Sequence, residues 1–363
     1  MNRFDYVRPR TVAEAVAAGA EPGSAFLAAG TNLLDLMKIG VARPARLVDL
    51  NHLPGLAAIE NTSDGGVRIG AQVRNADLAY EPDFARRFPA VAEALLSGAS
   101  AQLRNAATVG GNLLQRTRCA YFQDTASACN KRAPGNGCDA RDGENRLHAV
   151  LGWSDACIAT HPSDFCVPLA AFEAVVEIEG PAGRREIPLQ DFHLLPGNTP
   201  ERETVLAPGE LIVALRLPAE AAAFAAHSRY VKLRERTSYA FAVVSAAAGL
   251  RMQGGRIAAA RLALGGVAAK PWRAEAAEAA LLGAAPEADA FRRAAELALA
   301  EARPSGENAF KIELARRIAV RALTLAAAGI PLRPDPGRLA WLRSIACGTA
   351  PMPASRSPAA TAY

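Results

Sequence analysis

The sequence predicts an α+β protein with two main domains, and three features indicate this. Short apolar runs typical of buried strands alternate with helical segments over the first hundred residues. Beyond residue 228 two strand-like runs flank a segment that fits a strand or a helix, and three helical segments follow. Half of the 363 residues are hydrophobic, so the chain can form the core that such layers need.

Capping and turn signals place the expected elements of the first half. Thr11, with Glu14 three residues later, forms a capping box ahead of a helix. The apolar run 26–29 is typical of a buried strand, and it ends at the turn 30–32, after which a helix begins. The other elements expected here are strands at 46–50 and 67–71 and a helix at 88–96.

A second group of elements follows an irregular segment. A helix and then a strand are expected between 167 and 180, whereas 239–250 fits a strand and a helix equally well. The remaining expectations are elements at 187–192 and 210–215, strands at 228–234 and 257–266, and helices at 274–282, 288–301 and 307–328.

The domain boundary is placed near 218–227. This gives a first domain at 1–222 and a second at 223–332. The tail 348–363 is rich in Ala, Pro and Ser, and we expect it to be disordered.

Charge and hydropathy exclude two classes of protein. The net charge of +5 comes without a Lys/Arg stripe interleaved with aromatic residues, so no nucleic-acid interface is expected. No apolar stretch reaches the length of a membrane span, and the N-terminal residues lack the apolar region of a signal peptide. We expect the chain to fold in the cytoplasm and to leave it only with a partner that carries a signal.

Two glycine-containing loops are candidates for holding a phosphate-bearing cofactor. In 27–34 a strand ends, Gly30 turns the chain and a helix starts, which leaves backbone N–H groups free for an anion. In 104–113 two adjacent glycines allow the backbone to approach a ligand closely. Neither loop is a Rossmann or P-loop motif. A lone Gly-Thr-Asn is usually a surface turn, so the prediction depends on the pair of loops.

Clustered cysteines are the most informative feature of the sequence. Four of the six cysteines, with nine, eight and eighteen residues between them, fall in or just after a polar, aperiodic segment at 115–154. In a reducing compartment such clustering favours metal over disulfides. No C-x-x-C pair occurs, which disfavours a zinc ribbon and the ferredoxin patterns. Four unrelated buried cysteines remain the alternative. The four residues are Cys119, Cys129, Cys138 and Cys157.

The other thiols and nearby histidines are given no such role. Cys166 lies in an apolar helical segment and is expected to be a buried core thiol. Cys347, near the tail, is interpreted as incidental. His148 and His161 are expected to be bystanders, because a lone histidine in a loop is seldom a ligand.

Two motifs carry a family resemblance. AAGTNLL at 28–34 and RNAATVGGNL at 104–113 resemble the FAD-binding domain of xanthine dehydrogenase and carbon monoxide dehydrogenase flavoproteins. Further similar segments occur in the family's order, and the resemblance covers roughly 3–330. One departure is Ala29, where the family usually has glycine; a positive φ there would be unfavourable.

The resemblance implies a fold and a cofactor. The fold is a two-part FAD-binding domain of the vanillyl-alcohol-oxidase type at 1–222, followed by a CO dehydrogenase flavoprotein-type α+β domain at 223–332. The residues around the FAD pyrophosphate would be Phe26, Leu27, Ala28, Ala29, Gly30, Thr31, Asn32, Leu33 and Leu34. The residues completing the second phosphate and ribityl contact would be Thr108, Gly111 and Asn112.

Three more positions match the family with less certain roles. Asp164 is implied to accept a hydrogen bond from a cofactor hydroxyl, although a helix N-cap would also explain it. Ile212 and Lys232 are implied to lie near the isoalloxazine, although Lys232 would also fit as a solvated strand lysine.

The cysteine segment narrows the resemblance. Two subgroups of the family carry a [4Fe–4S] cluster in an insertion at this place, the 4-hydroxybenzoyl-CoA reductases and the periplasmic aldehyde oxidoreductases. The segment 115–160 is similar to the aldehyde oxidoreductase version, in which these four cysteines are the ligands. Nearby Arg and Lys side chains would offset the negative charge of a thiolate-ligated cluster.

The implied function is that of an electron-transfer subunit. A molybdopterin-binding large subunit would oxidise aldehydes to carboxylic acids, and a small [2Fe–2S] subunit would pass electrons to FAD in this chain. Alternatives left open are a 4-hydroxybenzoyl-CoA reductase-like complex, a xanthine dehydrogenase-like complex that uses NAD, and an assembly protein without flavin. The resemblance also implies that the complex can be exported in folded form. It leaves open the aldehyde range, the electron acceptor, the stoichiometry and the role of the cluster.

Overall fold

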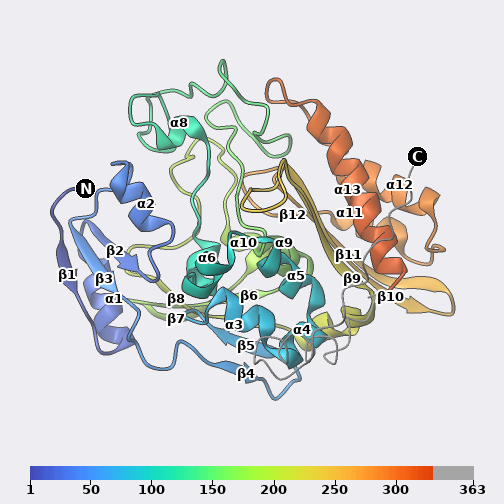
Figure 1. Cartoon of the computed structure of the whole chain (residues 1–363), viewed down its shortest axis with the longest axis horizontal. Coiled ribbons are helices and arrows are strands. Elements are labelled where there is room, and N and C mark those ends of the chain that lie inside the picture. The colour runs from blue at the N-terminus through green and yellow to red at the C-terminus, as the bar shows by residue number, and fades with distance from the viewer. Residues whose placement is uncertain (330–363) are drawn as a thin grey trace, which may run out of the picture. The chain divides into compact units, whose positions relative to one another are not determined.

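Three β-sheets organise the chain in the computed structural model, which describes residues 1–329 (Figure 1). The expected disordered tail at 348–363, Cys347 and the last residues of the second expected domain lie outside the described residues.

The first sheet is parallel and belongs to the N-terminal segment. Its order is β1-β3-β2, and Phe26 of β2 pairs with Val48 of β3. Thr11 caps the first helix by accepting a hydrogen bond from the backbone N–H of Glu14, as the capping box predicts. The elements are β1 (Asp5–Val7), α1 (Val12–Ala20), β2 (Ser24–Leu27), α2 (Leu33–Lys38) and β3 (Arg46–Asp49).

The second sheet is antiparallel and has five strands in the order β4-β5-β8-β6-β7. Its central strand β8 is buried at all but one position, so both faces are covered. The strands are β4 (Ile59–Asn61), β5 (Val67–Gly70), β6 (Val175–Gly180), β7 (Gly183–Pro188) and β8 (Leu211–Leu217). The helices between them are α3 (Asn75–Tyr80), α4 (Pro82–Arg87), α5 (Pro89–Ser97), α6 (Ala101–Ala106), α7 (Val109–Leu113), α8 (Ala120–Gln123), α9 (Cys166–Ala171) and α10 (Leu189–Phe192).

The third sheet is an antiparallel meander, β12-β11-β10-β9, and its helices pack on it to enclose a separate apolar core. Of the segment 239–250, which fitted two structures, residues 244–250 belong to the long strand β10, which pairs with both neighbours, and 239–243 lie outside it. The elements are a 3₁₀ helix (Ala219–His227), β9 (Ser228–Leu233), β10 (Val244–Gln253), β11 (Arg256–Gly265), β12 (Trp272–Arg273), α11 (Glu275–Leu281), α12 (Ala288–Ala298) and α13 (Phe310–Ala327).

The cysteine segment is irregular, as expected, and α8 is its one short helix. Residues at the start of helix α13 and just before it form hydrogen bonds to this segment. Lys311 is fully buried, and its Nζ donates to the carbonyl oxygens of Leu147, His148 and Gly266 at 2.9, 2.8 and 2.6 Å. Asn308 adds two bonds to the carbonyls of His148 and Ala149. The segment therefore takes part of its shape from residues 160 positions away.

Candidate functional site

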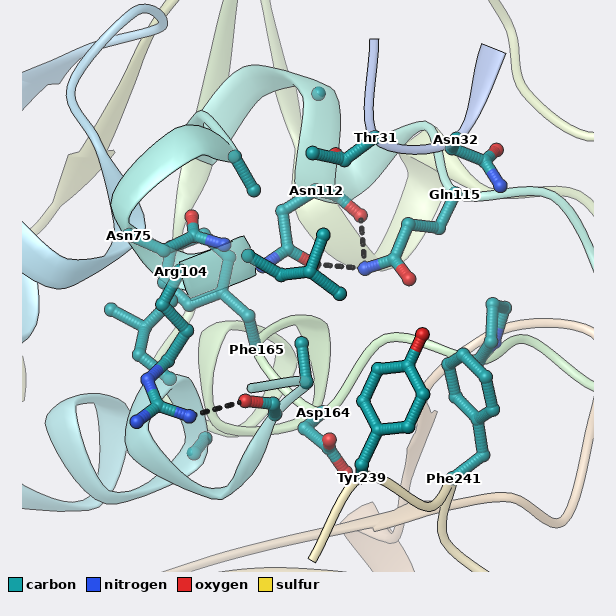
Figure 2. Close-up of a pocket in the computed structure, with 18 of the residues that line it drawn as sticks. Thr31, Asn32, Asn75, Arg104, Asn112, Gln115, Asp164, Phe165, Tyr239 and Phe241 are labelled. Carbon is teal, nitrogen blue, oxygen red and sulfur yellow. Dashed lines mark hydrogen bonds between the residues drawn. The ribbon is translucent and has the colours of Figure 1, made fainter. Parts of the chain in front are cut away.

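Two cavities meet at the loops that the sequence selects. Cavity A lies at the end of β2, lined by the loop 28–33 and by β8. Cavity B lies between α5, α6, α9 and the start of the third sheet (Figure 2). Thr31, Asn32 and Gly111 line both, so the cavities adjoin. One elongated ligand with a nucleotide end and a ring end can occupy both cavities.

The loop after β2 presents free backbone donors to these cavities. Gly30 has a φ of +76°, the left-handed region that favours glycine, whereas Ala29 is not among the residues with positive φ. The family's usual glycine is therefore dispensable at Ala29. Within residues 1–329, the amide N–H groups of residues 29–33 donate to no other protein group. Such a run of free N–H groups is suited to a pyrophosphate.

Not every residue of the expected cradle reaches the cavities. Phe26 and residues 28–33 line cavity A, but Leu27 and Leu34 line neither cavity. Their side chains lie around Gly30 instead: a Cβ placed there would meet Leu34 Cδ1 at 2.5 Å and Leu27 Cδ1 at 3.4 Å. The contact of these two leucines with a cofactor stays a prediction; in the structure their side chains pack against Gly30.

The second loop forms the start of α7. Thr108 caps this helix, and its Oγ1 accepts a hydrogen bond from the Gly111 N–H at 3.2 Å. Gly110 lies close against Ala71. A Cβ at Gly110 would lie 2.8 Å from the Ala71 Cβ and 3.0 Å from the Ala71 carbonyl oxygen. Close approach of two backbones thus explains the first glycine, and Gly111, which lines both cavities, faces the ligand space.

Asn112 is held in a fixed orientation at the border of cavity B. Its Oδ1 accepts a hydrogen bond from Gln115 Nε2 at 2.6 Å (Figure 2). A second bond to the same oxygen comes from Ser163 Oγ at 2.7 Å. Because both bonds use the carbonyl end of the amide, the NH₂ end is left as a donor for a ligand.

A buried ion pair forms one wall of cavity B. Lys232 Nζ lies 2.8 Å from Asp164 Oδ2, with side-chain exposures of 4% and 7%. The Tyr230 hydroxyl donates to the other carboxylate oxygen at 2.5 Å. Burial, followed by the Asp164 charge, raises the pKa of Tyr230 well above its usual value, so its proton stays on the phenol.

These contacts decide between the interpretations of the two residues. Lys232 is not a solvated strand lysine. Asp164 does not cap a helix through its side chain, since Ser163 Oγ accepts from the Cys166 N–H instead. Ile212 lines cavity A and Lys232 lines cavity B, so the structure does not bring them together as a pair.

Unpartnered buried polar atoms around the cavities provide a test of whether FAD fits. Asn32 Nδ2, Asn75 Oδ1 and Arg104 Nε line cavity B, and Gln72 Oε1 lines cavity A; in the described part of the chain each is buried without a hydrogen-bond partner. Buried polar atoms are nearly always satisfied, so these sites point to a polar ligand. Apolar side chains make up much of the remaining lining, for example Leu95, Leu103 and Phe165 in cavity B, which suits a flavin ring.

Aromatic residues at the mouth of cavity B were not foreseen from the sequence. Tyr239 and Phe241 are 57% and 47% exposed, and Arg118 stacks over the Phe241 ring at 4.9 Å (Figure 2). Burial lowers the pKa of Arg118 from its usual value, although Asp35 and Tyr239 oppose the shift. The only available signal was a pair of aromatic residues in a segment whose structure was ambiguous.

The four clustered cysteines line one small cavity. All four are free thiols. The backbones of Cys129 and Cys138 pair as an isolated antiparallel β-bridge, which brings two turns of the segment together. Burial raises the pKa of Cys119 to about 11, and the neighbouring Cys129 and Cys157 add to that shift. Thiols held together in this state ionise readily only with a metal.

Sulfur spacing favours a cluster over a single ion. Among the described residues, no three of these four thiols lie within 4.8 Å of one another. Four thiolates on one zinc would lie roughly 3.8 Å apart, given Zn–S bonds of about 2.3 Å. A cubane cluster separates its ligands more widely, because each sulfur binds a different iron. Four thiols that line one small cavity are a donor set of the kind that a [4Fe–4S] cluster needs.

Polar groups complete the surroundings of the cysteine cavity. His148 Nε2 lies 3.2 Å from Cys119 Sγ. Lys131 is 5% exposed; it donates to the Pro200 carbonyl at 2.8 Å and pairs with Glu203 at 3.1 Å. These donors and cations lie where a thiolate-ligated cluster would carry negative charge.

Comparison with known proteins agrees with this fold and site. Residues 2–220 match the FAD binding domain in molybdopterin dehydrogenase, and residues 229–326 match the CO dehydrogenase flavoprotein C-terminal domain. The chain therefore belongs to the family of FAD-binding subunits of molybdenum hydroxylases, and it is an oxidoreductase subunit.

Particular relatives narrow this class. The chain is 51% identical to the aldehyde oxidoreductase FAD-binding subunit PaoB of Escherichia coli K12, over 87% of this chain and 96% of that protein. It is 31% identical to the carbon monoxide dehydrogenase medium chain of Hydrogenophaga pseudoflava, over 89% and 97%. A solved structure of carbon monoxide dehydrogenase from that organism has a chain that superposes with a TM-score of 0.69 at 32% identity, covering 90% of this chain and 98% of that one. In residues 1–329, no helix is long and apolar enough to cross a membrane.

Proposed function

We propose that this chain is the FAD- and [4Fe–4S]-containing electron-transfer subunit of a molybdenum-dependent aldehyde oxidoreductase. FAD would lie across cavities A and B, with its pyrophosphate at the loop 28–33 and its ring between Asn112, Asp164 and Lys232. Ile212 would contact the nucleotide half. The similarity to an aldehyde oxidoreductase FAD-binding subunit supports the choice of substrate class.

One observation carries the electron-transfer part of the proposal. A single stretch of eight residues contributes Asn112, Gln115 and Arg118 to the wall of cavity B and Cys119 to the cysteine cavity. The two cofactor sites are therefore joined covalently through adjacent residues. That arrangement supports transfer between the cluster and the flavin over a short path.

The complete reaction requires partner subunits. Oxidation of an aldehyde adds the oxygen of water and releases two electrons and two protons, and a molybdopterin-binding large subunit would perform it. A small [2Fe–2S] subunit would deliver the electrons singly. When bound, FAD exchanges one or two electrons and so links one-electron centres to a two-electron acceptor. This chain's residues bind and orient the flavin and leave the mouth of cavity B, near Tyr239 and Phe241, open to the acceptor.

Cofactor analysis tests the first part. The chain, purified anaerobically with its partners, should release one FAD on denaturation and contain four iron atoms beyond those of the [2Fe–2S] subunit. Cys157→Ser should lose most of that extra iron, whereas Cys166→Ala, a matched change at a buried thiol outside the cavity, should keep it. Finding zinc in place of iron on the four cysteines would refute the cluster assignment.

Substrate assays test the second part. The complex should oxidise aromatic aldehydes with an artificial acceptor, and loss of FAD should abolish reduction of the natural acceptor but not that of the molybdenum subunit. Reduction of 4-hydroxybenzoyl-CoA without aldehyde oxidation would favour the alternative complex.

The proposal also covers where the complex lies in the cell. We expect this subunit to fold in the cytoplasm and to be exported with a partner that carries a signal. Fractionation of cells that express the whole complex checks this expectation, since recovery only in the cytosol would contradict export.

A further inference from the structure

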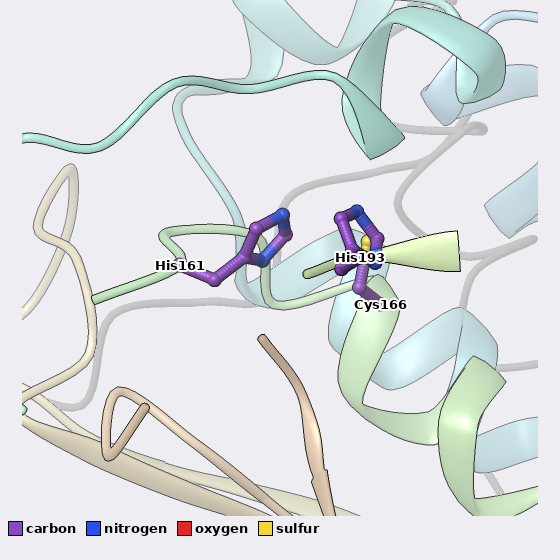
Figure 3. Close-up of side chains that lie close together, drawn as sticks. All are labelled: His161, Cys166 and His193. Atoms are coloured by element: carbon purple, nitrogen blue, oxygen red, sulfur yellow. The ribbon is translucent and has the colours of Figure 1, made fainter. Parts of the chain in front are cut away.

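A second group of metal-binding side chains lies outside the cysteine cavity. His161, Cys166 and His193 each offer one ligand atom, and these atoms lie within 4.8 Å of one another; within residues 1–329 this is the one group of its kind (Figure 3). The three come from the loop before α9, the first residue of α9 and the residue after α10.

His193 is oriented as a metal ligand would be. Its Nε2 lies 2.9 Å from the Leu113 carbonyl oxygen, which can only accept, so Nε2 carries the hydrogen. The neutral ring then presents a lone pair at Nδ1. That atom is buried without a hydrogen-bond partner in the described structure, and the residue is 2% exposed. Ligating histidines characteristically donate their second N–H to a backbone carbonyl in this way.

His161 and Cys166 face the same point. The rings of His161 and His193 meet edge to face, with centroids 4.4 Å apart. His161 Nε2 is a second buried nitrogen without a partner. Its Nδ1 accepts a long hydrogen bond of 3.4 Å from the Ser163 N–H, and binding a metal through Nε2 would exchange that bond for a hydrogen on Nδ1. Figure 3 shows the Cys166 sulfur beside the His193 ring and the His161 ring turned toward both. Cys166 is fully buried.

We propose that His161, Cys166 and His193 bind a zinc ion. Two imidazole nitrogens and one thiolate form a borderline-soft donor set that zinc prefers over calcium or magnesium. A water molecule completes the tetrahedron, since the two histidines also line a cavity that is open to Thr117, Lys131 and Glu203. His161 is then a ligand and not the bystander that its sequence context suggests.

The position of the site gives the ion a structural role. It joins the segment 161–166, whose Asp164 and Phe165 line cavity B, to the chain after α10. It also lies behind Leu113, the residue that follows Asn112. Zinc at this point fixes the wall that holds the flavin, and it takes no part in redox chemistry.

Metal analysis of the assembled complex tests the proposal. Protein made in zinc-supplemented cells and purified without chelator should contain about one zinc per copy of this chain. Cys166→Ala and His193→Gln should each lower the zinc content at least about tenfold while the cluster iron stays unchanged. His227→Gln, at a half-buried histidine that bonds only to the Ala326 carbonyl, is the matched control and should keep the zinc.

Cobalt substitution keeps the test valid if a histidine variant fails to fold. Wild-type protein loaded with Co²⁺ should show the visible bands of a tetrahedral site together with a thiolate-to-cobalt band, and Cys166→Ala should remove the latter. Zinc well below one per chain, or zinc that Cys157→Ser removes and Cys166→Ala does not, would overturn the proposal. Because iron and FAD are counted separately, that failure is distinct from failure of the proposed function.

Discussion

Breaking the buried pair of Asp164 and Lys232 should destabilise the protein more than removing the pair entirely. Both side chains are almost fully shielded from water, at 7% and 4% exposure, and their charged atoms lie 2.8 Å apart. Lys232→Met leaves a buried carboxylate that keeps only the Tyr230 hydroxyl as its donor. Loss of one partner of a buried pair typically costs about 3–5 kcal/mol.

The double variant gives the decisive comparison. Asp164→Asn with Lys232→Met leaves no unpaired charge, and its loss of stability should stay below about 2 kcal/mol, because uncharged replacements of a buried pair are often nearly neutral. The Ser97 carbonyl, which loses Lys232 as a donor, keeps Arg234 at 3.3 Å. If each single change costs about 3–5 kcal/mol and the double change less than about 2, the coupling energy is at least about 4 kcal/mol.

Urea unfolding followed by tryptophan fluorescence measures the cycle, and bound FAD is quantified in parallel. The exposed pair Asp83–Arg86 is the matched control, with side-chain exposures of 40% and 74% and an expected coupling below about 1 kcal/mol. Additive effects at Asp164 and Lys232, within about 0.5 kcal/mol, would refute the argument that charge burial dominates this wall.

Three further outcomes are expected. Gly110→Ala should cost about 1–3 kcal/mol in thermal unfolding, because its Cβ would meet Ala71 at 2.8 Å, whereas Gly111→Ala should chiefly reduce bound FAD; equal stability of the two variants would contradict this. Burial lowers the pKa of Lys311 to about 7. Above that pH the unfolded chain binds more protons than the folded chain, so the free energy of unfolding should rise by about 1.5 kcal/mol from pH 7 to 8.5 through this residue. Lys311→Met should remove that rise in urea unfolding, and an unchanged pH dependence would exclude the assignment. A chain that ends at residue 305 should retain less than a tenth of the cluster iron by metal analysis; normal iron would show that α13 is not needed.

Local patterns predicted the parts of the fold that local interactions determine. The capping box at Thr11, the strands 46–50 and 67–71 and the irregular cysteine segment all correspond to what the structure contains. Long-range pairing could not be predicted in the same way. Segment 239–250 fitted two structures until its pairing with β9 and β11 was known, because strand formation there depends on partners and not on propensity.

The candidate site also has residues that the sequence could predict and residues that it could not. The positions around cavities A and B could be selected from two motifs, but the reason for Gly110 is its contact with Ala71, which no motif states. Arg118 and Phe241 were missed because their stacking joins residues more than a hundred positions apart. The grouping of His161 with His193 was also missed, because the two residues are far apart in the sequence.

The three bonds from Lys311 have a consequence for the order of events during synthesis. The carbonyl oxygens that they fix, at residues 147 and 148, lie within the cysteine segment, but the lysine leaves the ribosome more than 150 residues later. Until α13 has been synthesised, the segment that carries the thiols lacks these hydrogen bonds. For the cluster proposed above, iron and sulfide would therefore enter late, as a maturation step on a nearly finished subunit.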